Sequence, residues 1–312
     1  GSNVGQATLR KLDKNWKSYF ASIKDYGKHP EKYKGVPKMP QYFPTETGRY
    51  ECGLDNNKFK IANGYIYFCW KPLKVMNGIF KTKIPEGSKL IQLRFIPKNG
   101  EYVMETVYEV EIPDINNVSS RIAAIDLGVD NLMTLTTNCG VQPFIVNGKP
   151  LKSINQYYNK EIARIQSDLK KRHDKSSSNE LIRFTNKRNN KVDDYIQKST
   201  RLVVNYCKDN NIDTLDCGYN SGWKQRSTMN KKSNQKFVEI PYSSIVWRLS
   251  YKCENEGIRF IQQEESYTSG TSFLDGETPS QENYNKSRRV YRGLFVTEKG
   301  EKINADVNGS YQ

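Results

Sequence analysis

The chain has 312 residues, of which 49 are lysine or arginine and 34 are aspartate or glutamate, so its formal net charge is +15. An apolar fraction of 36% with 12% aromatic residues excludes wholesale disorder, and no apolar run approaches the roughly 20 residues that a membrane span needs. The basic excess predicts a polyanionic partner, foremost a nucleic acid, because tyrosine and asparagine lie among the basic residues and suit contacts with bases. The alternative is a basic protein without such a partner.

Cysteine usage bears on the compartment. None of the six cysteines forms a C-x-x-C pair, and the long, lysine-rich chain shows no signal peptide. We therefore expect reduced, partly buried thiols in a cytoplasmic protein that has no membrane partner. The cysteines are Cys52, Cys69, Cys139, Cys207, Cys217 and Cys253.

The first predicted element is a helix over residues 4–25. Apolar residues recur there at spacings of three and four, which places them on one face, and lysines occupy much of the remainder. The polar face either meets a phosphate backbone or is simply solvated. The apolar positions are Leu9, Leu12, Trp16, Tyr19, Phe20 and Ile23, and the lysines are Lys11, Lys14, Lys17 and Lys24.

Residues 27–49, rich in proline, lysine and glycine, predict an extended connector, and residues 50–112 then carry short strands. Asn-Gly and Pro-Glu-Gly turns separate these strands, and residues 105–112 alternate between charged and apolar side chains, which is typical of a half-buried strand. Short strands broken by such turns predict an antiparallel β-barrel or sandwich. The strands are expected at residues 58–61, 65–70, 90–97 and 101–112.

A second domain is predicted from about residue 120 onward. Short apolar strands come first, two long polar helices follow, and a strand, a helix and another strand complete the order. Gly257 marks the end of that third helix, since glycine is typical just after a helix C-terminus. This order predicts an RNase H-like mixed sheet flanked by helices, within an α+β or α/β chain. The strands are expected at 121–125, 131–137, 141–146, 212–217 and 258–262, the helices at 151–172, 179–210 and 240–255, a loop-rich stretch at 268–302, and a final helix near Asp306.

Three carboxylates far apart in the sequence lie at the ends of predicted elements. Asp126 follows an apolar strand, Glu265 follows another strand, and Asp306 starts the final helix. Taken singly, Asp126 also fits a turn and Asp306 also fits a helix N-cap. Together they predict an all-oxygen site for Mg²⁺, because buried acids are costly without a cation and two such ions are the usual machinery for cutting phosphodiesters.

Residues 222–237 hold five basic residues and no acid. This segment is either a solvated loop or a surface for nucleic-acid backbone contacts, and the overall charge favours the second interpretation. The helices within 151–210 are expected to add further backbone contacts. The candidate nucleic-acid-binding residues are Lys11, Lys14, Lys17, Trp223, Lys224, Arg226, Lys231, Lys232, Lys236, Arg288 and Arg289.

Four motifs in combination resemble the transposon-encoded TnpB (OrfB) family, which comprises ancestors of type V CRISPR effectors and relatives of the Fanzor proteins. The resemblance covers essentially the whole chain. It implies an RNA-guided DNA endonuclease of the bacterial nucleoid, with guide RNA and double-stranded DNA as partners and with Asp126, Glu265 and Asp306 coordinating two Mg²⁺ ions. The motifs are Ala-Ile-Asp-Leu-Gly at 124–128, Trp-Lys-Gln at 223–225, Glu-Ser-Tyr-Thr-Ser at 265–269 and Asn-Ala-Asp-Val-Asn-Gly at 304–309.

The middle acid departs from the common family pattern. Many members carry a glutamate on the strand that corresponds to residues 215–219, where this chain has Gly218. A Fanzor-like branch uses a glutamate just before Tyr-Thr-Ser, which matches Glu265, with its neighbour Glu264 as the alternative and Asp216 still open. Because side chains alternate along a strand, one of the two adjacent glutamates points inward, and the sequence leaves open which one.

The resemblance also implies a division into domains. We expect no zinc site in them. A zinc ribbon needs two C-x-x-C pairs, and residues 268–303 contain no cysteine. Compared with the family, the chain looks short at both ends, so a truncated derivative, a nuclease-impaired RNA-guided repressor and a general RNA-binding protein are the alternative hypotheses. The implied parts are a recognition-helix remnant at 1–26, a wedge-type β-barrel at 27–118, a RuvC-like nuclease domain at 119–267, a target-binding insert at 268–303 and a last RuvC-like segment at 304–312.

Overall fold

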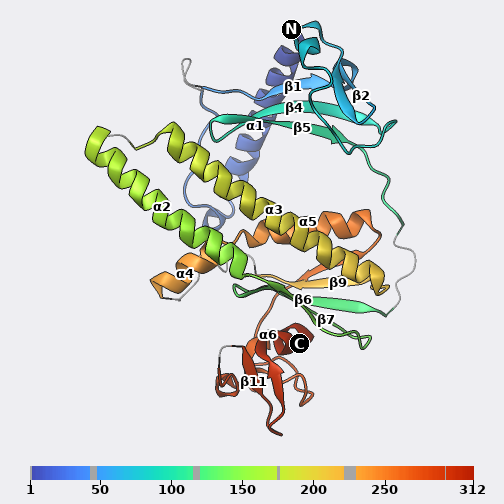
Figure 1. Ribbon diagram of the computed structural model, residues 1–312, viewed down its shortest axis with the longest axis vertical. Helices are drawn as coiled ribbons and strands as arrows, with labels where there is room; N and C mark the ends of the chain where they lie inside the picture. Colours follow the sequence, from blue (N-terminus) through green and yellow to red (C-terminus); the bar gives the residue numbers. More distant parts are fainter. Residues whose placement is uncertain (1, 43–47, 115–119, 174–175, 221–229, 292) are drawn as a thin grey trace. The chain divides into compact units, whose positions relative to one another are not determined.

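The computed structural model describes the chain except residues 1, 43–47, 115–119, 174–175, 221–229 and 292. The chain divides into two compact units, Gly1–Val110 and Glu111–Gln312 (Figure 1). Both units mix helices and strands, as the sequence predicted. None of the described helices combines the length and the apolar character that crossing a membrane requires.

The first unit joins one long helix to two small antiparallel sheets. Its core consists of buried side chains from four strands, such as Leu54, Phe68 and Leu93. Strands β1, β4 and β5 form a three-stranded sheet in the order β1-β4-β5, and β2 pairs with β3. The elements are α1 (Ser2–Tyr26), β1 (Cys52–Asp55), β2 (Phe59–Ala62), β3 (Tyr65–Phe68), β4 (Leu90–Lys98) and β5 (Glu101–Tyr108).

The predicted strands of this unit are present, but within its described residues they do not close into a barrel. The β2–β3 hairpin turns through Asn63 and Gly64, both with positive φ (51° and 72°), which matches the tight turn that Asn-Gly prefers. Such a turn pairs each strand with its immediate neighbour, and the two hairpin strands share no ladder with the three-stranded sheet. The predicted helix is confirmed, but Leu9 and Phe20 of its apolar face remain largely exposed.

The second unit is built on a five-stranded mixed sheet with the order β10-β9-β6-β7-β8. Strand β7 runs antiparallel to β6 and β8, whereas β6, β9 and β10 run parallel to one another. The carboxyl ends of β6, β9 and β10 therefore meet at one edge of the sheet. The strands are β6 (Ile122–Asp126), β7 (Asn131–Thr137), β8 (Phe144–Asn147), β9 (Thr214–Gly218) and β10 (Arg259–Gln263).

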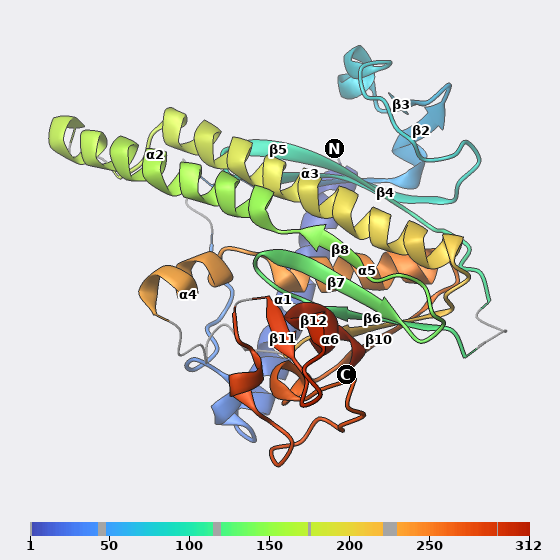
Figure 2. The same ribbon diagram turned by 60° about the horizontal axis from the view of Figure 1, so that its bottom comes forward.

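Helices cover one face of this sheet, and the C-terminal segment covers the other (Figures 1 and 2). Alternating residues of β6 and β9, such as Ile125 and Leu215, are buried against the helices, together with Val203 of α3 and Leu249 of α5. The predicted end of α5 is confirmed, because Gly257 has φ +69° just beyond the helix. The helices are α2 (Lys149–His173), α3 (Asn179–Asp209), α4 (Lys231–Val238) and α5 (Tyr242–Asn255).

The stretch predicted as loop-rich contains two short 3-10 helices and a two-stranded sheet before the final helix. The final helix, α6, contacts β6 and β7 on the sheet face opposite α3 and α5 (Figure 2). These elements are η4 (Thr268–Gly270), η5 (Lys286–Arg288), β11 (Leu294–Val296), β12 (Lys302–Asn304) and α6 (Ala305–Tyr311).

Candidate active site

Asp126 ends β6 and lies on the face of the sheet away from the helical core. Its strand neighbours Ala123 and Ile125 are buried on the other face, so alternation along the strand turns Asp126 toward α6. The turn that follows needs glycine at position 128, because a Cβ there would lie only 2.4 Å from the carbonyl oxygen of Asn131. The Tyr242 hydroxyl donates to the Gly128 carbonyl at 3.1 Å and so holds the turn.

Glu265 reaches the same edge of the sheet from beyond β10. Its backbone N–H donates to the Asn220 side chain, whose amide group donates back to the Glu265 carbonyl, both at 2.9 Å. A Cβ on Gly218 of β9 would lie 1.6 Å from Glu265 Oε1, so the carboxylate occupies the space that any side chain at 218 would fill. The neighbouring Glu264 is exposed. The glutamate next to the Tyr-Thr-Ser motif therefore stands where Gly218 leaves room for it.

Asp306 lies in the first turn of α6 without being its N-cap. Asn304 takes that position, and its side chain accepts hydrogen bonds from the N–H groups of Asp306 and Val307 at 3.0 and 3.2 Å. The Asp306 carboxylate is thereby left to other partners. It accepts from Asn131 Nδ2 at 2.8 Å through one oxygen and pairs with Arg289 Nη2 at 3.2 Å through the other.

The three acids line one pocket. Burial raises the pKa of Asp126 to about 7, an effect that the nearby Asp306 carboxylate increases and Arg289 opposes. Burial likewise raises the pKa of Glu265 to about 8, with further increases from Asp126 and Asp216. The pocket thus holds more negative charge than its one arginine offsets. Its lining residues are Asp126, Leu127, Gly128, Glu265, Tyr267, Thr268, Ser269, Arg289, Ala305, Asp306 and Gly309.

The backbone of Tyr267, beside the acids, has an unusual conformation. It lies in the left-handed region with φ 65°, which is uncommon for a residue with a side chain and tends to occur at functional sites. The residue lines the acid pocket two positions after Glu265. The Tyr-Thr-Ser motif thus turns the chain sharply as it leaves the pocket.

A hard divalent cation suits the chemistry of these donors, since Mg²⁺ prefers carboxylate oxygens. Across the described part of the chain, however, no three histidine, cysteine, aspartate or glutamate side chains are grouped closely enough to hold a metal ion. Both oxygens of Asp306 are engaged, one by Asn131 and the other by Arg289. Burial raises the pKa values of Asp126 and Glu265, so a cation beside them would stabilise their ionised forms.

Asp216, the remaining alternative for the middle acid, lies on β9 two residues before Gly218 and does not line the pocket. Gln263 donates to one of its oxygens, and burial raises its pKa. Its charge also raises the pKa of Glu265. The structure thus brings Asp126, Glu265 and Asp306 together and leaves Asp216 beside them.

The candidate nucleic-acid-binding residues lie in several places. On α1, Lys11 pairs with Glu51 at 2.6 Å, Lys17 pairs with Asp13 at 2.8 Å, and Lys14 is exposed. Trp223, Lys224 and Arg226 lie outside the described residues. The segment predicted as a basic loop includes helix α4, which carries Lys231, Lys232 and the half-buried Lys236.

Arg288 and Arg289, although adjacent, have different surroundings. Arg289 lines the acid pocket, whereas Arg288 forms ion pairs with Glu277 and Glu298 within the C-terminal segment. Sequence reasoning missed Asn131 and Asn304, which hold Asp306. Asn304 carries a usable signal, because asparagine directly before a short helix is a frequent N-cap; Asn131 carries none, because it meets Asp306 only through the fold.

Two protein families match segments of this chain. Residues 105–224 match the family described as OrfB_IS605, probable transposase, and residues 242–312 match the family described as Cas12f1-like, TNB domain. No curated protein matches the sequence.

Three solved structures resemble the chain at low sequence identity. A Cas12f1–sgRNA–target DNA complex matches at 16% identity with a TM-score of 0.47, covering 91% of this chain and 73% of that one. A CRISPR-Cas12f ternary complex matches at 14% identity with a TM-score of 0.48, covering 91% of this chain and 66% of that one. The mini-RNA-guided endonuclease CRISPR-Cas_phi3 matches at 12% identity with a TM-score of 0.39, covering 70% of this chain and 50% of that one.

The two family matches contain the residues of the acid pocket. Asp126 lies in the first matched segment, and Glu265, Arg289 and Asp306 lie in the second. These matches confirm the family resemblance that the motifs predicted. Residues 105–224 thus resemble the OrfB_IS605 family and residues 242–312 resemble the Cas12f1-like TNB domain, a combination consistent with a TnpB-like protein related to type V CRISPR effectors.

Proposed function

We propose that the protein is an RNA-guided DNA endonuclease that depends on Mg²⁺. One observation carries the proposal: three carboxylates from distant segments line one pocket, at the sheet edge where β6 and β10 end and α6 begins. Asp126, Glu265 and Asp306 are the residues that would hold two Mg²⁺ ions. Ions bound there would activate the attacking water and stabilise the leaving 3′ oxygen.

The topology supports a RuvC-like interpretation of the second unit. The strand order β10-β9-β6-β7-β8, with β7 antiparallel to both of its neighbours, is the arrangement expected of an RNase H-like sheet. In open sheets of this kind, sites form where the carboxyl ends of parallel strands meet. The acid pocket occupies that edge.

Guide RNA and double-stranded DNA are the proposed partners. The net charge of +15 and the two family matches support this proposal, in which base pairing selects the target and the protein reads a short flanking motif. Arg289 is suited to a phosphate contact, because a guanidinium matches phosphate oxygens in a bidentate manner and this one already lies among the acids. The wedge-type and recognition parts assigned to 1–118 and the target-binding role of 268–303 belong to the same proposal.

A nuclease-impaired, RNA-guided binding protein is the second candidate, and one observation favours it. Both oxygens of Asp306 are engaged, by Asn131 and by Arg289, and the described acids are not grouped as metal ligands. On the nuclease hypothesis, Asp306 would have to release Arg289 in order to hold a cation; on the binding-protein hypothesis, the ion pair persists.

The experiment purifies the protein with its RNA and adds a matched double-stranded target with Mg²⁺. We expect cleavage by the wild type and a loss of at least about 1,000-fold in Asp126→Ala, with RNA binding retained, because the metal-ion machinery supplies most of the rate. Glu265→Ala should behave in the same way, and Glu264→Ala, the exposed neighbour, serves as the matched control.

Each outcome of this experiment decides between the hypotheses. Undiminished cutting by Asp126→Ala would sink the active-site assignment. Target binding without cutting by the wild type would favour the guided binding protein, and RNA binding without any response to a matched target would favour a general RNA-binding protein.

A further inference from the structure

Helix α6, which carries Asp306, is fixed to the sheet at its C-terminal end. Ser310 is 4% exposed, and its hydroxyl lies 3.0 Å from the Ala124 carbonyl and 2.9 Å from the Thr134 carbonyl. The Thr136 hydroxyl donates to the Ser310 carbonyl at 2.9 Å. These contacts settle where the end of α6 sits on β6 and β7.

The opposite side of α6 is tied to the start of the segment 271–298 by Asn308. This asparagine is fully buried, and both groups of its amide are used: Nδ2 donates to the Thr271 carbonyl at 2.7 Å, and Oδ1 accepts from the Phe273 N–H at 3.0 Å. The Phe273 ring also stacks on Tyr311, with centroids 4.4 Å apart. One face of the helix is thereby attached to the backbone at 271–273.

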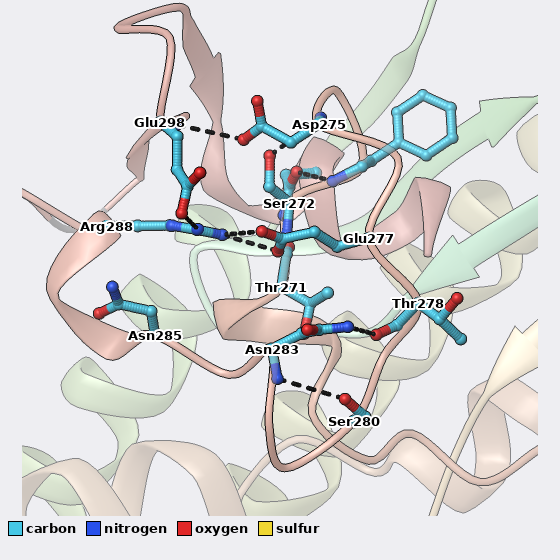
Figure 3. A network of polar contacts seen from close by, with 12 residues as sticks. Thr271, Ser272, Asp275, Glu277, Thr278, Ser280, Asn283, Asn285, Arg288 and Glu298 are labelled. Carbon is cyan, nitrogen blue, oxygen red and sulfur yellow. Dashed lines mark hydrogen bonds and ion pairs between the residues drawn. The ribbon is translucent and has the colours of Figure 1, made fainter.

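The backbone at 271–273 is in turn held by an ion-pair network around Arg288 (Figure 3). Glu277 accepts from the Ser272 N–H at 2.8 Å and from Arg288 Nη1 at 2.6 Å. Arg288 Nη2 pairs with Glu298 at 2.6 Å, and the Glu298 N–H donates to Asp275 at 3.1 Å. One guanidinium thus joins the two ends of the segment.

Asn308 does not line the acid pocket, and a buried amide is costly unless it is hydrogen-bonded, as both groups of this one are. We propose that Asn308 is a positioning residue: its two backbone hydrogen bonds connect the Arg288 network to α6 and set Asp306 beside Asp126. The inference rests on the proposed nuclease function. It adds that segment 271–298 controls the placement of an acid in the pocket.

A connection of this kind is reciprocal, because a ligand that stabilises one end of a linked system is itself bound more tightly when the other end is ordered. A cation at the acids should therefore protect the backbone at 271–277. Loss of the Arg288 network should loosen α6. An asparagine that only fills the core would transmit neither effect.

The test measures amide hydrogen exchange of the full chain with and without Mn²⁺, which serves as the probe. In the wild type we expect Mn²⁺ to slow exchange at 271–277 by about fivefold or more, and in Asn308→Ala we expect this protection to vanish and Mn²⁺ to bind about tenfold more weakly. Asn283→Ala is the matched control, because Asn283 makes a similar amide-to-carbonyl bond, to Thr278, inside the segment. Asn308→Asp, which keeps the acceptor, replaces the alanine variant if that variant does not fold.

The outcomes separate this inference from the proposed function. Protection at 271–277 that persists in the Asn308 variant, or that is lost equally in Asn283→Ala, overturns the positioning role. A wild type that shows no response to Mn²⁺ overturns the metal site instead. In that case the metal-free exchange of Arg288→Met decides: faster exchange of the α6 amides supports the positioning role, and unchanged exchange overturns it.

Discussion

Two groups of acids in the same unit have opposite electrostatic states. In the pocket, burial and mutual repulsion raise the pKa values of Asp126 and Glu265. In the Arg288 network, the hydrogen bond from Arg288 lowers the pKa of Glu277, and the hydrogen bond from Ser272 lowers that of Asp275. The residue types are alike, so the difference comes from burial in the pocket and from the hydrogen-bond partners in the network.

The charges of the Arg288 network are balanced within the fold, whereas those of the acid pocket are not. Arg288 is 10% exposed at its side chain and lies between Glu277 and Glu298, so the charges balance within the fold (Figure 3). Arg289 is the one arginine among the residues that line the acid pocket, where it faces three carboxylates. Excess charge of this kind is typical of functional sites, because the missing partner is a ligand.

The largest expected effect comes from breaking the balanced group. Arg288→Met leaves the half-buried Glu277 without its cation and removes the largely buried guanidinium between two acids, and we expect the free energy of unfolding to fall by about 3 kcal/mol. Urea unfolding followed by circular dichroism measures this change. Glu298→Gln is the control, because Glu298 is largely exposed and its loss should cost less than about 1 kcal/mol. Equal losses in the two variants would contradict the view that Arg288 is the centre of the network.

The next effect comes from filling the space that Glu265 occupies. Gly218→Ala places a Cβ 1.6 Å from the position of Glu265 Oε1, so the carboxylate must shift from its place in the pocket. We expect the cleavage rate to fall by about a hundredfold, since a displacement of about an ångström at a reacting site costs that much. Gly5→Ala, at a glycine with open space around it, is the control. Cleavage at the wild-type rate in Gly218→Ala would remove Glu265 from the site.

Glu265→Gln removes the charge of this side chain but keeps its shape, and so tests whether the pocket holds excess negative charge. The folded-state pKa of Glu265 lies above its unfolded value, so the folded protein retains the proton longer and loses stability as pH rises from about 4.5 to about 8. In Glu265→Gln the part of this loss that comes from Glu265 should be absent, while the part that comes from Asp126, whose pKa is raised to about 7, remains. The metal-free variant should therefore be roughly 2 kcal/mol more stable than the wild type at pH 8. Chemical unfolding in EDTA at pH 5 and pH 8 provides the measurement. Glu264→Gln should follow the wild type, and a wild type with a flat profile would mean that the pocket is not overcharged.

The smallest expected effect tests how closely α6 approaches Asp126. A Cβ on Gly309 would lie 3.3 Å from Asp126 Oδ2, a contact that a shift of a few tenths of an ångström relieves. Alanine also favours the helix, so we expect Gly309→Ala to raise the free energy of unfolding by about 0.5 kcal/mol. Thermal unfolding measures the change. A clear loss of stability would show that the pocket tolerates no displacement of Asp126.

Local sequence patterns were sufficient for most of the elements, and the motifs supplied the candidate acids. Strands β6, β7, β9 and β10 follow apolar runs that end in polar or glycine residues, and α2 and α3 lie within one or two residues of the predicted ranges. Hydrophobic periodicity and turn residues act over a few positions, so a single sequence displays them directly. Of the predicted barrel or sandwich, no closed barrel is present among the described residues of the first unit, because closure depends on pairing between distant strands, which a local pattern does not display.

The choice between Glu264 and Glu265 was decided by tertiary structure. Both glutamates follow β10, and only the register of β10 against β9 brings Glu265 over the empty side of Gly218. The different surroundings of Arg288 and Arg289 have the same origin, because their partners lie at Glu277, Glu298 and Asp306.

By itself, the sequence determined the family, the order of the elements and the set of acids. The tertiary structure decided which acids share a pocket, that Asn304 rather than Asp306 caps α6, and that Asn308 links α6 to the C-terminal segment. The reason is physical. Propensity and periodicity act between neighbours in the chain, whereas burial, hydrogen bonding and charge act between neighbours in space, such as Ser310 and Ala124, which are 186 residues apart in the sequence.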